Sequence, residues 1–178
     1  MHEVIAVMEH IVFVFDCASL VLAGLLAGVM LAVCFIFNPR GLDASAYVTQ
    51  QQWGVRTLHP KVPPLGIATV VASLVAALLP RSDATHTLLL YLATGLIIAA
   101  GLITKLLNMP VNALVMTWSP KDPPAQWMSM RDSWWRWHIL RLTAGALGFG
   151  VLVVAALRQP GCQICGNIGF KVNLIPLA

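Results

Sequence analysis

The chain has 178 residues, of which 58% are hydrophobic and only 10% are charged, and its mean hydropathy is +0.80. Soluble domains carry about 25% charged residues, so this composition excludes a soluble globular domain and indicates a polytopic membrane protein. The formal net charge is +4. In a membrane protein an excess of basic residues indicates topology and contact with lipid headgroups. The sequence contains no RNA- or DNA-reading motif. We therefore expect the lipid bilayer as a partner and no nucleic acid.

Four apolar segments are candidates for crossing a hydrocarbon core of about 30 Å, which takes about 20 helical residues. The first is too long for the apolar part of a signal peptide, and no Lys or Arg precedes it, so we expect it to be retained. The second is short and depends on its neighbours or on a thinned bilayer. The pattern predicts an all-α fold, a four-transmembrane-helix bundle within residues 1–157, followed by a tail, 158–178. The segments are 11–37, 64–79, 87–107 and 138–157.

Lys and Arg are unevenly distributed between the two sides of this bundle. By the positive-inside rule, the connections after the first and third segments lie in the cytoplasm, and both termini lie outside it. We expect an integral protein of the bacterial inner membrane, and leave homo-oligomerisation open. Glycines in segments one, three and four are expected to let the helices pack closely. The cytoplasmic connections hold Arg40, Arg56, Lys61, Lys105, Lys121, Arg131 and Arg136, and the other side holds Arg81, Arg158 and Lys171.

The first cytoplasmic connection contains a short interfacial helix. Asn38 and Pro39 end the first span, and Asp43 can cap a helix over residues 44–56. One interpretation is that this helix lies across the mouth of the bundle and lines a site. The other, equally supported, is a helix resting on headgroups with a snorkelling Arg and an interfacial Trp. Its polar and aromatic residues are Gln50, Gln51, Trp53, Arg56 and His59.

The second cytoplasmic connection is denser in polar chemistry. Asn108 and Asn112 are four residues apart on one helical face, and Pro110 between them removes a backbone hydrogen bond. Pro123 and Pro124 then open a second interfacial helix that leads into the last span.

Trp134, His138 and Arg141 follow at i, i+4 and i+7, which places an indole, an imidazole and a guanidinium on one stripe. Trp127 and Arg131 extend the stripe towards the helix start. Arg141 lies within the apolar run, where it needs an anionic or carbonyl partner, and this favours a functional role for Arg141 and His138. For the other indoles an aromatic belt at the membrane interface is favoured, at Trp127, Trp135 and Trp137.

These residues carry a resemblance. The segments NMPVNALVMTW, PPAQW and RDSWWRWHILR, ahead of the last span, are similar to the signature of the anthrone oxygenase-like integral membrane proteins. The resemblance extends from Asn38 and Pro39 through the fourth span. It implies a four-helix membrane bundle, and for the named members the oxidation of a polyketide anthrone to an anthraquinone with O₂. The residues carried over are Asn108, Pro110, Asn112, Trp134, His138 and Arg141.

Such a reaction suits these side chains. A neutral imidazole can deprotonate an activated aromatic CH₂ beside a carbonyl, so we assign the base to His138. Arg141, Asn108 and Asn112 are expected to hold the developing oxyanion. The carbanion can reduce O₂ directly, so no cofactor is required. The substrate is then a hydrophobic aromatic or quinol-like small molecule, and we expect it to be bound by Trp134, Trp53, His59 and Arg131.

Metal chemistry is the rival within the enzyme class. The histidines form no metal-binding motif such as HExxH, but the topology places His59 and His138 on one face, where copper or iron is an alternative cofactor. The opposite face offers His10 with Asp16. Asp16 lies inside the first span, where a carboxyl either joins helices or acts as a ligand or proton relay.

The four cysteines divide into two pairs. Cys17 and Cys34 lie within the first span and are interpreted as small core residues. Cys162 and Cys165 form a Cys-Gln-Ile-Cys in the tail, and outside the cytoplasm we expect them to form a disulfide. The alternative function is a non-enzymatic membrane subunit, or a protein that binds a metal or small molecule.

The charge asymmetry predicts that a reporter active only in the cytoplasm, fused after Ala178, is silent. The same reporter inserted in the connection after the first span, next to Lys61, is the matched control and should be active. Strong activity of the C-terminal fusion would reverse the assignment of both faces.

Overall fold

The computed structural model describes residues 2–158. Within that range the chain is helical and contains no β-strand, so the all-α prediction is confirmed. One isolated β-bridge joins Ser119 to Asp122 in the last connection. The elements are α1 (His2–Ile36), α2 (Ala44–Leu58), α3 (Val62–Leu78), α4 (Ala84–Ile103), the π-helical turn η1 (Thr104–Asn108), α5 (Met109–Val115) and α6 (Trp127–Leu157).

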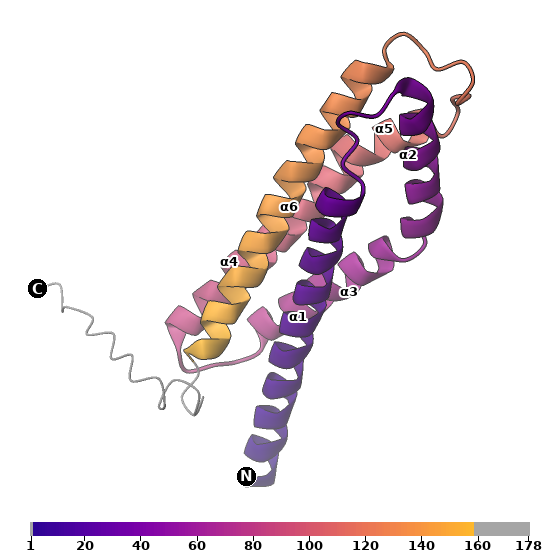
Figure 1. Cartoon of the computed structure of the whole chain (residues 1–178). Helices are drawn as coiled ribbons and strands as arrows, with labels where there is room; N and C mark the ends of the chain where they lie inside the picture. The colour runs from indigo at the N-terminus through magenta and orange to yellow at the C-terminus, as the bar shows by residue number, and fades with distance from the viewer. Residues whose placement is uncertain (1, 159–178) are drawn as a thin grey trace, which may run out of the picture.

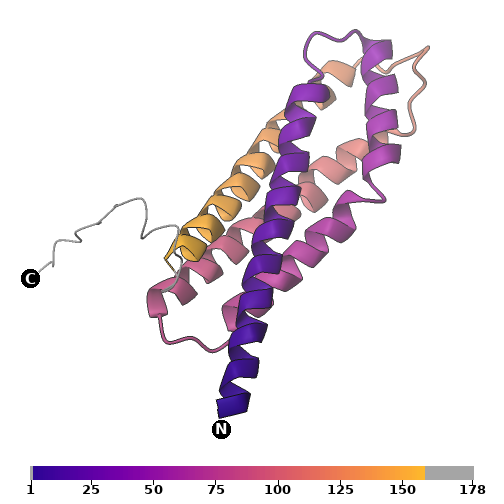
Figure 2. The ribbon, with the colours of Figure 1, turned by 60° about the horizontal axis from the view of Figure 1, so that its bottom comes forward.

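Four helices pack side by side along the molecule. α4 packs most extensively against α6, α1 lies between α3 and α6, and α3 contacts α4, so the four form a closed ring of neighbours. Figures 1 and 2 show α2 and α5 together at one end of this bundle, at the opposite end from the N-terminus and the connection between α3 and α4. α2 contacts α5 and α6 there.

Three stretches are long and apolar enough to cross a membrane: Glu3–Ile36, Ala84–Val115 and Trp127–Leu157. α3 has 17 residues, about 26 Å of helix, and is counted as a crossing only together with α2, from which it is bent by 50°. The helices are longer than the predicted segments, since the third continues past residue 107 and the last begins well before His138. The apolar run in the sequence locates the part of a helix that suits lipid, and these helices continue beyond that part.

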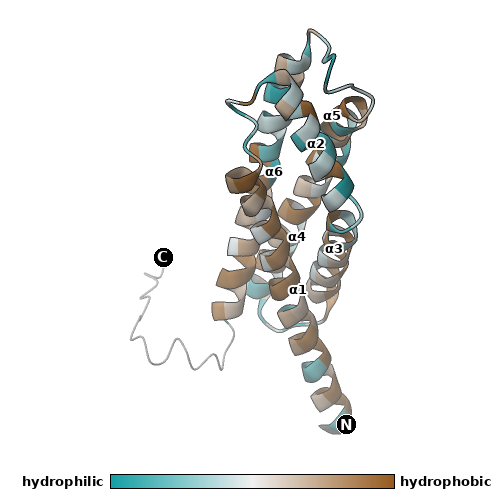
Figure 3. Ribbon diagram, turned by 45° about the vertical axis from the view of Figure 1, so that its right-hand side comes forward, coloured by the Kyte–Doolittle hydropathy of each residue, from teal (hydrophilic) through white to brown (hydrophobic). Residues whose placement is uncertain are grey.

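Much of the bundle surface is apolar, as lipid requires. Only 22–28% of the most apolar window of each candidate span is buried inside the protein, and Phe35 and Ile36 are 77% and 70% exposed. Figure 3 shows hydrophobic residues along the bundle and hydrophilic ones concentrated around α2, α5 and their connections. This is the surface of an integral membrane protein, with its polar chemistry at one end.

The helix predicted after Asp43 is confirmed as α2, whose start is capped by the Asp43 carboxylate, which accepts a hydrogen bond of 2.8 Å from the Ala46 N–H. Its inner face differs from expectation. Tyr47, Val48, Gln51 and Gly54 are buried, whereas Trp53 is 57% exposed. The polar Gln51 is turned inward, where its side chain donates a hydrogen bond to Asn112 of α5.

Small residues bring α6 close to its neighbours at three of the predicted glycines. A Cβ added at Gly145 would overlap the Met30 methyl, one at Gly148 would lie 2.9 Å from Ile97 Cγ1, and one at Gly24 of α1 would lie 3.1 Å from Phe149 Cε2. The same expectation is wrong for Gly28, Gly95 and Gly101, where a Cβ would have no atom within 4 Å.

Gly148→Ala should destabilise the protein, because its new methyl would also lie 3.2 Å from the Ala93 carbonyl oxygen, a backbone atom that cannot move aside. Overpacking of this kind costs about 1–3 kcal/mol, measurable as a lower melting temperature in detergent. Gly150→Ala is the matched control, since nothing lies within 4 Å of its Cβ position. Equal melting of the two variants would contradict close packing of α4 and α6.

Candidate functional site

At the polar end of the bundle, α4 continues into the π turn η1. The Met109 N–H bonds to the Thr104 carbonyl, one residue further back than in an α-helix. Pro110 follows immediately and has no N–H to donate, and the wide turn lets the helix continue past it. π turns of this kind occur frequently at functional sites. The turn and α5 carry Asn108 and Asn112.

Asn112 is the centre of a hydrogen-bond network between three helices. Its Oδ1 accepts from Gln51 Nε2 of α2 at 2.8 Å and from the Trp134 indole Nε1 of α6 at 2.8 Å. The completely buried Asn108 donates from Nδ2 to the Trp134 carbonyl oxygen at 3.0 Å. The two amides therefore fix both the ring and the backbone of Trp134.

His138 is fully buried against this indole. Its ring is stacked on Trp134, with centroids 5.3 Å apart and planes 7° apart, and lies against Trp135 at 5.6 Å. Arg141 Nε lies 3.0 Å from His138 Nδ1, and Cys34 Sγ lies 3.2 Å from Nε2. A guanidinium N–H can only donate, so Nδ1 accepts, and the proton of the neutral ring is on Nε2, directed at Cys34.

This arrangement constrains the predicted base. With Nδ1 accepting from Arg141 and Nε2 carrying the proton, His138 has no free lone pair. It can accept a proton from a substrate only after Arg141 releases Nδ1. As it stands in the structure, His138 orients Arg141.

Arg141 is one of two cations, with Lys105, that line the cavity of the bundle. Its guanidinium carbon lies 6.0 Å from the centroid of the Trp134 ring, and Nε is held by His138. Within residues 2–158 no carboxylate forms an ion pair with it. A cation among apolar helices that is held, among the described residues, by a neutral imidazole and an indole face is suited to bind an anionic or carbonyl oxygen.

The cavity beside Arg141 has a volume of about 570 Å³, within the usual range of roughly 300–1,000 Å³ for small-molecule sites. At one end it is polar, and along α1, α3 and α4 it is apolar. The exposed Ile67 and Gly101 are part of its wall, so it borders the lipid-facing surface. The polar lining comprises Gln50, Gln51, His59, Thr104, Lys105, Asn112 and Arg141, and the apolar lining includes Leu26, Met30, Val33, Phe37, Val70 and Ile97.

The predicted substrate-binding residues separate into two groups. Trp134 and His59 line this cavity. Of the described residues, Trp53 and Arg131 lie outside its lining: Trp53 stacks on Phe37 at 5.5 Å, and Arg131 lies over the Trp127 ring at 5.1 Å.

Trp135 also departs from expectation. It is only 7% exposed and packs with Val33 of α1. It is therefore a core residue rather than a member of an aromatic belt.

The described part of the chain holds no group of three or more His, Cys, Asp or Glu side chains that could bind a metal ion. His59 is exposed in the cavity wall, whereas His138 is buried behind Arg141. At the other end His10 is exposed and bonds its own helix at the Ala6 carbonyl. The copper or iron site predicted for these residues stays a prediction.

Asp16 is part of a buried ion pair. Arg81, from the connection before α4, donates to both of its carboxylate oxygens at 2.8 and 2.5 Å. His86 Nε2 lies 3.9 Å from the same carboxylate. The carboxyl therefore joins helices through an arginine, a partner that the sequence interpretation had not considered. The predicted disulfide of Cys162 and Cys165 lies outside the described residues.

Cys34 was missed as a residue of the site. It was interpreted as a small core residue, and 104 positions separate it from His138. Nothing in its spacing or neighbours indicates the contact. The hydrogen bond between Gln51 and Asn112 was likewise not predicted, although the predicted helix across the bundle mouth contains Gln51.

Comparison with known proteins places this network in a family. A family model described as anthrone oxygenase matches residues 55–151, more than half of the chain. The matched range contains His59, Asn108, Asn112, His138 and Arg141, but not α1 with Cys34. No curated protein and no solved structure matches the chain.

The shared oxygen of Asn112 predicts energetic coupling between α2 and α5. In a double-mutant cycle, Gln51→Ala and Asn112→Ala should each lower the stability in detergent, and their combination should deviate from additivity by about 0.5–3 kcal/mol. Gln50→Ala is the control for Gln51→Ala, because Gln50 donates to the Phe37 carbonyl instead. Additive effects for Gln51 and Asn112 would contradict the bond.

Proposed function

Because the chain belongs to the anthrone oxygenase family, we propose that it is a membrane oxidoreductase that oxidises a planar aromatic or quinol-like molecule with O₂. In this proposal α1, α3, α4 and α6 are the four crossings of the bundle. The substrate occupies the cavity of about 570 Å³ between them. The observation that carries the proposal is Arg141, a cation that lines this apolar cavity without a carboxylate partner among the described residues.

Arg141 binds the carbonyl oxygen of the substrate and stabilises the enolate formed when a neighbouring C–H is deprotonated. Fixed donors are most effective where water is scarce. When Arg141 turns from His138 to that oxygen, Nδ1 of His138 is released and can take the proton. A single movement thus supplies both the oxyanion partner and the base. His59, which is exposed in the cavity wall, is the second imidazole that can serve as the base.

The remaining chemistry belongs to the substrate and O₂. The carbanion gives one electron to O₂, and the resulting radical and superoxide combine to a hydroperoxide on the former CH₂ carbon. Loss of water then leaves a carbonyl. One oxygen atom enters the product and the other leaves in water, so the step balances without a further reductant.

The alternative is a non-enzymatic membrane protein. The bonds of Asn108 and Asn112 to Trp134 favour it, because they join the segment Thr104–Val115 to α6 and stabilise the bundle. A transition metal is a separate addition to the proposal, with His59 and, once Arg141 has released Nδ1, His138 as its ligands. Elemental analysis of the purified protein tests it directly.

The activity test measures O₂ uptake and quinone absorbance with a tricyclic anthrone, using detergent-purified protein against a protein-free blank. Arg141→Ala should lower the protein-dependent rate about 10²- to 10³-fold, as loss of an oxyanion donor does. Arg141→Lys should not restore it, because an ammonium lacks the planar fork. Arg56→Ala, an exposed arginine of α2, should have no effect.

A substitution at Gly101 tests the proposed substrate cavity independently of Arg141. Gly101 lines the cavity, and a Cβ there would have open space around it, so Gly101→Leu fills the cavity without disturbing the fold. Activity should be lost while the melting temperature is kept. Gly150→Leu, on a glycine outside the cavity lining with equal space, is the control. Full activity in Arg141→Ala or Gly101→Leu would overturn the proposed site.

A further inference from the structure

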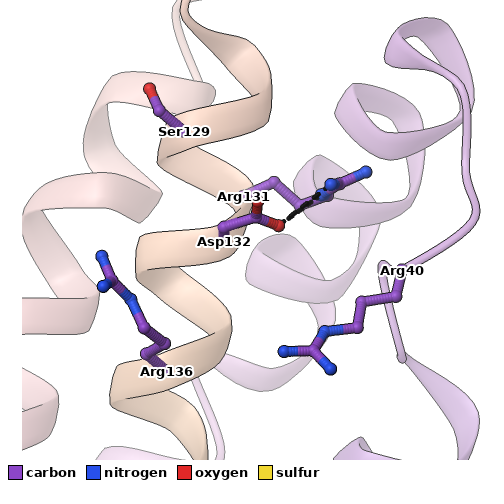
Figure 4. A pocket seen from close by; sticks show the side chains of 5 residues that line it. All are labelled: Arg40, Ser129, Arg131, Asp132 and Arg136. Carbon is purple, nitrogen blue, oxygen red and sulfur yellow. Dashed lines mark hydrogen bonds and ion pairs between the residues drawn. The ribbon is translucent and has the colours of Figure 1, made fainter.

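A second hollow, of about 660 Å³, lies on α6 at the same end of the bundle and shares no lining residue with the substrate cavity. Figure 4 shows Arg40 extending towards α6 from the loop after α1. The other side chains in the figure, Ser129, Arg131, Asp132 and Arg136, belong to successive turns of α6. The contact is close, since the Arg40 guanidinium carbon lies 6.0 Å from the Trp135 ring centroid on α6. The hollow is lined by Arg40, Ser129, Arg131, Asp132 and Arg136.

Its charges are unbalanced, because three guanidinium groups face a single carboxylate. Asp132 pairs with the neighbouring Arg131, at 2.9 Å from both Nε and Nη2, and not with Arg136 four residues on. Within residues 2–158 neither Arg40 nor Arg136 has an ion-pair partner. Two guanidinium groups from separate elements are therefore left for an external anion.

Exposed apolar residues lie near both arginines in the chain. Arg40 follows the end of α1 by four residues, and the last residues of that helix, Phe35 and Ile36, are strongly exposed and apolar. Arg136 precedes Ile139 and Leu140, which are 40% and 47% exposed. Arginines beside an exposed apolar surface are expected at the depth of the headgroup phosphates.

We propose that Arg40 and Arg136 bind the phosphate of an anionic phospholipid headgroup in this hollow. Guanidinium groups suit phosphate because they donate parallel hydrogen bonds to its oxygens, and basic pockets on membrane proteins take anionic headgroups in this way. Arginines that merely extend to the interface need share no hollow, whereas Arg40 and Arg136 line the same hollow from different elements. The bound headgroup bridges the loop after α1 to α6.

The test uses the full-length protein in detergent, with binding measured by native mass spectrometry. Short-chain phosphatidylglycerol should bind, and phosphatidylcholine of the same chain length should bind at least about 10-fold more weakly. Arg136→Gln, at an exposed position, should reduce phosphatidylglycerol affinity several-fold, and Arg40→Gln with Arg136→Gln should abolish the preference for it. The melting temperature of each variant checks that it is folded.

Arg56→Gln is the matched control, since it removes an exposed arginine outside the hollow and should leave binding unchanged. Equal affinity of the wild-type protein for the two lipids would overturn the proposal, as would wild-type binding by the folded double variant. Displacement of phosphatidylglycerol by millimolar inorganic phosphate would overturn it as well, because it would assign the hollow to free phosphate.

Discussion

The hydrogen bond between Arg141 and His138 is the constraint on which the rest of this site depends. A guanidinium among apolar helices has to be held by the protein itself, since lipid offers it no partner. Here the holder is a neutral imidazole, fully buried and enclosed by two indoles. Asn108 and Asn112 fix Trp134, Trp134 supports the imidazole, and the imidazole sets the direction of the guanidinium. The polar residues at this end therefore act as one structure and not as independent ligands.

At the opposite end of the bundle, a largely buried arginine is stabilised in a different way. Arg81 meets Asp16 through both carboxylate oxygens, so that cation is matched by an anion of the protein. Breaking such a buried pair is costly because it leaves an uncompensated charge, which suits a fixed joint between α1 and the connection before α4. Arg141 has no such anion among the described residues and borders a cavity. The contrast between the two arginines supports the proposed binding role of Arg141.

Local sequence signals predicted the helices well, because each depends on residues close together in the chain. Apolar runs located α1, α3, α4 and α6, Asp43 marked the start of α2, and spacing along α6 placed His138 and Arg141 on one stripe with Trp134. Contacts between distant segments could not be predicted in this way. Cys34 carries no local sign of its place beside His138, and Trp53 was expected in the site because an indole can stack on a planar substrate. The outward position of Trp53 follows from the partner that Gln51 finds on α5.

The order of these contacts also explains how the site can be both rigid and responsive. Trp134 is held at its ring and at its backbone, so it provides a fixed surface under Arg141. Among the described residues, the one hydrogen bond of the Arg141 side chain is that from Nε to His138. In the proposed reaction, a ligand oxygen draws the guanidinium away from His138, and this frees Nδ1 without moving the indole of Trp134. Oxyanion binding and proton acceptance would then depend on the same hydrogen bond, and a substitution that loosens Trp134 should weaken them together.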